Sequence, residues 1–395
     1  MKTRDLVERT LRAWNQHEID RGASAVIDFD FRPPPDTSEP PVPTDRLTTF
    51  RQLSELLEDA NDPAVSQRIN ADLAYLRALM GERAPLDEYI RATQGCPATG
   101  WPAEYITEKG EIARQCLAAL HVGWGESTAI DLDAAEGPID AADAPDAIRS
   151  AAIEYEADVR RATGSDAVYE LTIEAADVDA YWAYWLDGAG QQVRLRLNMR
   201  NASYTKVQAR QFALHEVLGH GLQSASIAAR CADEDVPWVR LLSVHGPQQV
   251  LLEGWAQAAP LFITPDDRAL IARVRIDHYS QLVRAELHRA VNNGTPIEEC
   301  AQYARTHVPW WTDSQIASLL ADRSTSPQLR TYMWAYAAGI DWFANLADSD
   351  PAVIQSVLRS AYRAPLTPTD LERLWPKGPA VGGPRGLPEN HITHY

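Results

Sequence analysis

The stretch HEVLGHGLQ, residues 215–223, decides how the rest of this chain is interpreted. It differs from the zinc-protease sequence His-Glu-x-x-His because its second histidine, His220, comes one residue late. In a regular α-helix, side chains five positions apart point about 140° away from each other, so His215 and His220 would not face one ion. A π-type turn, with hydrogen bonds from i to i+5, removes this difficulty. We therefore predict a local widening of the helix between Val217 and His220.

Two glycines flank the late histidine, and they favour such a widening. Gly219 precedes His220 and Gly221 follows it. Glycine weakens a regular helix because it leaves the backbone free to adopt other conformations. The sequence therefore provides a way to bring both imidazole rings to one metal ion.

A third metal ligand is expected at Glu253, in the stretch QQVLLEGWAQAAP. Zinc in enzymes commonly takes three protein ligands and keeps one position open. Glu253 is the acid of an otherwise apolar helical run, where an unpaired carboxylate is unfavourable and coordination would explain it. The alternative interpretation is an acid near a helix N-terminus, satisfied by backbone amides. Gln257, one turn later, is positioned to hydrogen-bond a ligand.

Glu216, next to His215, is the natural general base for this site. A metal ion lowers the pKa of a water molecule towards neutrality, and a nearby carboxylate can take its proton. The metal prediction is thus one Zn²⁺ held by His215, His220 and Glu253. Two histidines and one carboxylate also form the set that binds Fe(II) in oxygenases, so an iron-dependent enzyme of small-molecule secondary metabolism stays open.

Composition limits the remaining classes of function. The chain has 395 residues and a formal net charge of −18, which argues against nucleic acid as a partner. Its sequence contains no apolar run long enough to span a membrane. The N-terminus lacks the apolar core of a signal peptide, so we expect a cytoplasmic location. Nothing in the sequence indicates the oligomeric state.

The apolar spacing predicts a mostly α fold with a small antiparallel β-sheet. Residues 1–165 form a helical region that includes a proline-rich strap, FRPPPDTSEPPVPTD, and residues 166–395 form the metal-binding catalytic region. Three alternating or aromatic stretches between 167 and 199 predict the sheet, whose last strand, Val193–Asn198, leads into the metal helix. Helices are then expected at about 205–229, 248–263, 266–292, 296–306, 313–320, 328–347 and 351–362.

The motif and its downstream partner resemble the bacterial DUF885 family of zinc peptidases. That family has His-Glu, then Gly-His and Leu-Gln, then a downstream Glu-Gly-Trp-Ala, as in HEVLGHGLQ and LLEGWA here. VRAELHRAVNNGTPIEECAQYA and YMWAYAAGIDWF are similar to later helices of the family, so the resemblance covers about Val193 to Leu346. The HExxxH spacing is also similar to that of tubulin tyrosine carboxypeptidases. The chain departs from the family where Leu-Gly-His replaces a longer Pro-Gly-His segment and where Gly221 replaces a common second histidine.

The resemblance implies a gluzincin-like zinc hydrolase acting on a peptide or a small amide-containing substrate. It also implies an edge strand over the metal helix. The stretch RLRLN, ending at Asn198, would then pair with an extended substrate, although an ordinary strand of a small sheet is an equally good interpretation.

Hydrolysis also needs a donor for the oxyanion and groups that hold the substrate. Tyr336, in a Tyr-x-x-Gly context, is the first candidate donor, His288 the second, and Tyr332 a weaker one; a tyrosine packed in the core is the alternative. Arg284 shares a helical face with His288 and is a candidate for binding a substrate carboxylate. A surface salt bridge is the alternative for Arg284.

Overall fold

The computed structural model describes residues 2–35, 40–178, 184–200 and 203–384, and most of them are helical. Before the sheet the chain forms α1 (Thr3–Asp20), α2 (Arg46–Glu58), α3 (Pro63–Leu79), α4 (Leu86–Gln94), α5 (Ala103–Ala118), α6 (Thr128–Glu136), a short 3₁₀ turn η1 (Ala141–Asp143) and α7 (Ala144–Thr163). This confirms the helical N-terminal region. The ends of the proline-rich strap contact α1, where Thr44 N–H donates to the Ala13 carbonyl at 3.1 Å; its middle, 36–39, lies outside the described residues.

After the sheet the chain returns to helices, as predicted. These are α8 (Lys206–Phe212), η2 (Ala213–Leu222), α9 (Gln223–Asp233), α10 (Gln249–Ile263), α11 (Arg268–Asn292), α12 (Ile297–His307), α13 (Asp313–Thr325), α14 (Pro327–Leu346), α15 (Pro351–Ala361) and α16 (Pro368–Leu374). In the described ranges, none of the helices combines the length and apolarity needed to cross a membrane.

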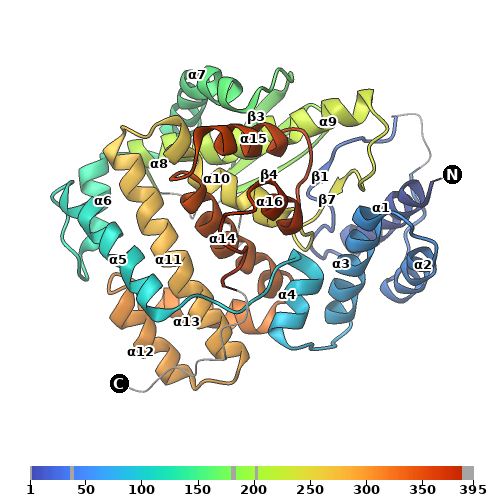
Figure 1. Ribbon diagram of the computed structural model, residues 1–395, viewed down its shortest axis with the longest axis horizontal. Helices are drawn as coiled ribbons and strands as arrows, with labels where there is room; N and C mark the ends of the chain where they lie inside the picture. The colour runs from blue at the N-terminus through green and yellow to red at the C-terminus, as the bar shows by residue number, and fades with distance from the viewer. Residues whose placement is uncertain (1, 36–39, 179–183, 201–202, 385–395) are drawn as a thin grey trace.

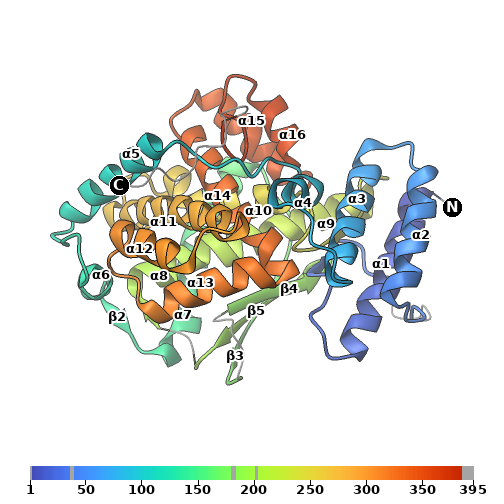
Figure 2. The same ribbon diagram turned by 90° about the horizontal axis from the view of Figure 1, so that it is seen from below.

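The main sheet is mixed, with the strand order β3-β5-β4-β1-β7. Its strands are β1 (Phe29–Asp30), β3 (Glu170–Ala176), β4 (Tyr184–Ala189), β5 (Gln192–Asn198) and β7 (Leu241–Leu242). A second, two-stranded sheet pairs β2 (Pro138–Ile139) with β6 (Tyr204–Thr205). Figure 2 shows β3, β4 and β5 along one side of the molecule, and β4 and β5 contact η2.

The prediction of an antiparallel sheet is wrong in part. β4 and β5 form the expected antiparallel hairpin through a turn at Gly190, where φ is +59°. However, β3 pairs with β5 in parallel, and β1 pairs with β4 in parallel. Alternation along a strand reveals which face is buried, whereas the choice of neighbour depends on contacts distant in sequence.

β5 is an interior strand, so the predicted edge strand over the metal helix is also wrong. β3 binds one side of β5 and β4 binds the other. Its backbone donors and acceptors therefore already have partners, and β5 offers no free edge to an extended substrate.

Three hydrophobic cores hold the described residues together, one of which joins the sheet to α9. The large core combines side chains from both sides of position 165, among them Ile90, Ile148, Leu214 and Trp255. Helices α1–α3 lie at one end of the molecule, as Figure 1 shows, and pack with Val26, Val239 and Leu241 in a smaller core.

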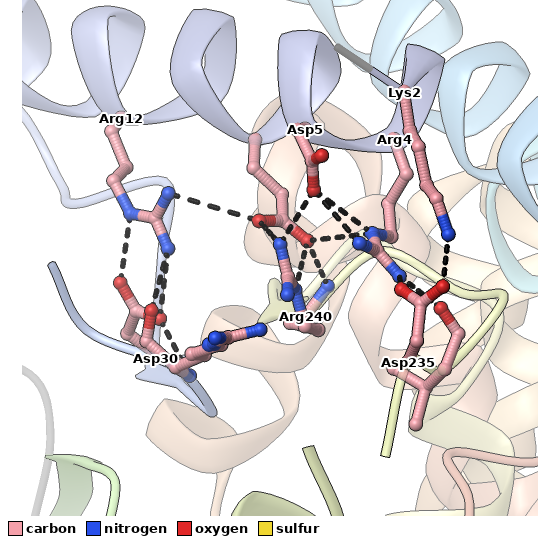
Figure 3. A network of polar contacts seen from close by, with 10 residues as sticks. Lys2, Arg4, Asp5, Arg12, Asp30, Asp235 and Arg240 are labelled. Atoms are coloured by element: carbon pink, nitrogen blue, oxygen red, sulfur yellow. Dashed lines mark hydrogen bonds and ion pairs between the residues drawn. The ribbon is translucent and has the colours of Figure 1, made fainter. Parts of the chain in front are cut away.

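Ion pairs attach α1 to the sheet side of the molecule (Figure 3). The guanidinium of Arg240, just before β7, lies 2.7 Å from the Glu8 carboxylate and 2.8 Å from Asp5. Arg12 donates to Asp30 of β1 at 2.9 Å. Because Glu8 and Arg240 are both buried, their pairing satisfies charges that would otherwise be unfavourable there.

Helices α10 and α14 cross in very close contact, and this crossing positions the candidate site. Gly254 of α10 faces Gly339 of α14; a Cβ atom at Gly254 would lie 2.5 Å from the Gly339 backbone. Only glycine allows two backbones to approach this closely.

We predict that Gly339→Ala destabilises the protein by about 1–3 kcal/mol, because the added methyl group must push α14 away from α10. The free energy of unfolding, measured in urea, checks this. Gly125→Ala is the matched control, since a Cβ there would meet nothing within 4 Å. Equal stability of the two variants would contradict the close crossing.

Candidate metal centre

The helix that carries the two histidines is a π-helix at its centre. α8, η2 and α9 run without a break, and η2 is π-helical from Ala213 to Leu222. The predicted widening between Val217 and His220 is therefore confirmed, and it extends further in both directions. With hydrogen bonds from i to i+5, His215 and His220 come onto one face.

The flanking glycines serve close packing as well as backbone freedom. A Cβ atom at Gly219 would lie 2.7 Å from the Leu214 carbonyl oxygen and 3.0 Å from the Ala256 Cβ atom of α10. A Cβ atom at Gly221 would lie 2.9 Å from Val193 of β5. Because these two glycines have no side chain, η2 can pack closely against α10, which carries Glu253, and against β5.

His215, His220 and Glu253 converge on one point. The two Nε2 atoms of the histidines are 3.2 Å apart. Glu253 Oε2 lies 3.6 Å from His215 Nε2, and Glu253 Oε1 lies 3.7 Å from His220 Nε2. The rings are nearly perpendicular, at 81°, so both nitrogens face the same space.

These separations fit a zinc ion. Zn–N and Zn–O bonds are about 2.0–2.2 Å long, so a tetrahedral ion holds its ligand atoms about 3.3 Å apart. Glu253 Oε2 is also buried without a hydrogen-bond partner, which leaves one carboxylate oxygen available as a ligand. The donor set, two imidazole nitrogens and a carboxylate oxygen, is one that zinc accepts.

The second oxygen of Glu253 is held by a tyrosine. The Tyr332 hydroxyl donates to Glu253 Oε1 at 2.5 Å, and the Tyr336 hydroxyl donates to the Tyr332 hydroxyl at 3.1 Å. Burial opposes ionisation of Glu253, but the positive charges of His220 and His215 outweigh it and lower the pKa of its carboxyl group. Glu253 is therefore ionised, and Tyr332 fixes the orientation of its carboxylate.

Glu216 lies beside this set. Its Oε1 atom is 3.5 Å from His215 Nε2, and only 4% of the residue is exposed. Burial raises the pKa of the Glu216 carboxyl group above its ordinary value, although His215 and His220 act in the opposite direction. A raised pKa suits a carboxylate that must take up and release a proton near neutral pH.

The site opens into a cavity of about 270 Å³ between the sheet and α14. Its wall combines the metal-site residues with aromatic and aliphatic side chains from β4, β7, α10 and α14. Those from β4 and α14 are Tyr184, Trp185, Leu186, Leu329, Tyr332, Met333 and Tyr336, and the amide of Gln328 also lines the cavity. No lysine or arginine lines the described wall.

Asp28, which sequence reasoning missed, also lines this cavity. Its Oδ2 atom is buried without a hydrogen-bond partner. Burial raises the pKa of its carboxyl group to about 8, with the charges of Asp187 and Glu253 adding to the effect and Arg68 opposing it. Asp28 comes from the N-terminal region, far from the motif in sequence, and a single acid before a two-residue strand gives no signal.

Tyr336 lines the cavity, as predicted, but three other predicted site residues do not. Asn198 is buried elsewhere, and its side-chain amide donates to the Val178 carbonyl at 3.0 Å. Arg284 lies with its guanidinium 5.3 Å from the centre of the Trp311 ring, and His288 packs 6.0 Å from the Trp334 ring. Neither Arg284 nor His288 lines the cavity.

Two further positions differ in detail from what the sequence indicated. Gln257 donates to the backbone carbonyl of Glu253, at 3.0 Å, and not to its carboxylate. Tyr332, considered the weaker of the two tyrosines, is the one that contacts Glu253 directly. Side-chain direction on α14 decides this, and sequence spacing alone does not reveal it.

Comparisons with known proteins add little to this geometry. No family model matches the chain, and no curated protein matches it. A solved structure described as a "putative lipoprotein" from Colwellia psychrerythraea is similar over 79% of this chain, with 14% sequence identity and a TM-score of 0.48. The match spans 58% of that chain's length.

We predict that Zn²⁺ raises the melting temperature of the wild-type protein and not that of Glu253→Gln or His220→Ala. A ligand that binds only the folded state stabilises it by about 2.7 kcal/mol at a hundred times its Kd. Calorimetry with and without Zn²⁺, and anaerobically with Fe²⁺, measures the effect and compares the two metals. His17→Ala on α1 is the control, and an undiminished zinc effect in Glu253→Gln would contradict the site.

Proposed function

We propose that the protein is a zinc-dependent hydrolase that cleaves a peptide or peptide-like amide bond. The observation that carries this proposal is the Glu253 carboxylate, whose unpartnered Oε2 atom faces His215 and whose Oε1 atom faces His220, beside the buried carboxyl group of Glu216. A structural ion would not need Glu216 or an adjoining cavity. An open cavity next to three ligands is typical of catalytic zinc sites.

The residues around the ligands have distinct tasks in such a reaction. Bound zinc would supply Lewis-acid chemistry, polarising the amide carbonyl and making a water molecule acidic. Glu216 takes the proton of that water and gives it to the leaving amine, which its raised pKa favours. Oxidation by iron, the alternative chemistry, has no evident use for this second carboxyl group. Glu216 therefore favours hydrolysis.

The two tyrosines remain hydrogen-bond donors during this reaction. Burial, reinforced by the charge of Glu253, raises the pKa of both hydroxyl groups well above the ordinary value, so both keep their protons. Tyr332 uses its proton to hold Glu253. Tyr336 lines the cavity and can turn its donor from Tyr332 towards a carbonyl oxygen on which negative charge develops.

Glu216→Gln should keep zinc binding and lower the hydrolytic kcat by about 10²–10⁴-fold, because an amide cannot accept the proton. Zinc content by mass spectrometry and turnover of a peptide library give the two readouts. Glu234→Gln, a change of the same kind at an exposed carboxylate, serves as the control. Full activity in zinc-loaded Glu216→Gln would exclude this mechanism.

Phenylalanine at each tyrosine should separate their tasks. Tyr336→Phe is expected to lower kcat by about 10²–10³-fold with unchanged zinc affinity, because only the oxyanion donor is lost. Tyr332→Phe should instead weaken zinc binding about 10–100-fold, since Glu253 loses the group that orients it. Normal kcat with a lowered melting temperature in Tyr336→Phe would mean that this tyrosine only packs.

A further inference from the structure

Asp28 carries a carboxyl group on the cavity wall for which the proposed hydrolysis has no task. The described wall includes three carboxyl groups, those of Asp28, Glu216 and Glu253. In the proposed reaction Glu253 holds the metal, and Glu216 takes the proton of the water molecule. The presence of a third carboxyl group, from a different part of the chain, therefore needs its own explanation.

Strand pairing fixes the position of Asp28. The residue directly precedes β1, and its backbone N–H donates to the Leu242 carbonyl of β7 at 3.0 Å. β1 lies between β4 and β7, so the backbone is held from both sides. The backbone N–H of Val244 also donates to the Asp28 carboxyl group. A rigid part of the sheet thus places this side chain in the cavity wall.

The Asp28 carboxyl group lacks a counter-ion within the described part of the chain. Its Oδ2 atom is buried without a hydrogen-bond partner. Arg68 acts on it electrostatically, but the guanidinium of Arg68 pairs with Asp72 at 3.1 Å and donates to Ser243 Oγ at 2.7 Å. A carboxylate that is removed from water without a cation is unfavourable, so a cation from outside the chain would stabilise it.

The cavity gives a cationic group access to Asp28. The residue is half-buried and lines the cavity, and no lysine or arginine on the described wall would repel a positive charge. Phe29, Tyr184 and Trp185 also line the cavity, and the faces of aromatic rings attract cations.

A primary ammonium group suits this position better than a second metal ion. Asp28 offers one unpartnered oxygen, whereas a hard metal ion needs several ligand atoms. An ammonium group carries one positive charge and three hydrogen-bond donors, so it can bind the carboxylate and still keep contact with water.

We propose that Asp28 binds a protonated amine of the substrate, so that the enzyme acts on amides that carry a primary ammonium group, either the α-amino group of a peptide or a side-chain amine. This substrate class rests on the proposed hydrolase function. The binding of the amine itself does not, because Asp28 is neither a metal ligand nor the base.

The test uses two pairs of probes in which a hydroxyl group replaces the ammonium group. One pair is leucinamide and its α-hydroxy analogue, which tests an α-amino group. The other is ε-aminocaproamide and its ε-hydroxy analogue, which tests a side-chain amine. Calorimetry at neutral pH on the zinc-loaded, full-length Glu216→Gln protein measures binding without turnover. In at least one pair the amine should bind about tenfold more tightly than the alcohol, or better.

Asp28→Asn removes the charge and keeps the shape of the side chain. Added to Glu216→Gln, it should weaken binding of the preferred amine about 10–100-fold and leave the matching alcohol unaffected. Unchanged binding of the alcohol also shows that the cavity is still folded, and Asp28→Ser, which is neutral too, should behave in the same way. Equal affinity for amine and alcohol in both pairs, or a preference for the amine that survives both substitutions, would overturn the proposal.

Asp30→Asn is the matched control, since Asp30 is two residues further along but pairs with Arg12 at 2.9 Å and does not line the cavity. It should preserve the preference for the amine. Mass spectrometry should find the same zinc content in Asp28→Asn as in the wild type. Loss of a metal ion in Asp28→Asn would make Asp28 a metal ligand and overturn the proposal.

Turnover by the wild type separates this proposal from the function on which it rests. Faster cleavage of leucine p-nitroanilide or ε-aminocaproic p-nitroanilide than of the hydroxy analogue, with the difference abolished by Asp28→Asn, supports both. Asp28-dependent binding of an amine, without cleavage of these anilides or of the peptide library, supports the amine site and overturns the hydrolase. Equal cleavage of amine and hydroxy substrates supports the hydrolase and overturns the amine site.

Discussion

Hydrogen bonding from i to i+5 along η2 is the constraint on which the metal centre depends. In a regular helix the rings of His215 and His220 would diverge, and no single ion could reach both. A π-helical segment of ten residues is rare and needs support from its surroundings. Here the Tyr362 hydroxyl donates to the Leu218 carbonyl at 2.6 Å, and Gly219 lets Ala256 approach closely. The close packing of η2 against α10 thus supports the π-helix and also places Glu253 beside the two histidines.

The polar groups of the site differ from the buried ion pairs that lie elsewhere in the molecule. Arg240 with Glu8 and Arg68 with Asp72 show the usual solution, in which each buried charge has an opposite partner. Around the cavity, oxygens of Glu253 and Asp28 lack partners. Buried polar atoms without a hydrogen-bond partner are characteristic of sites that bind a ligand.

The described wall of the cavity is acidic. Carboxyl groups of Asp28, Glu216 and Glu253 face the cavity, where a metal cation would offset them, and no lysine or arginine lines it.

The sequence by itself determined what depends on local spacing. Helical hydrogen bonds join residues a few positions apart, so α10 and α14 lie close to their predicted positions and the π-helix follows from the spacing of His215 and His220. The parallel pairing of β3 with β5, the interior place of β5, and the arrival of Asp28 at the cavity depended on contacts between distant segments. So did the choice of Tyr332 over Tyr336 as the partner of Glu253. Only the tertiary structure decided these, because strand pairing and cavity walls arise from long-range packing that no local pattern encodes.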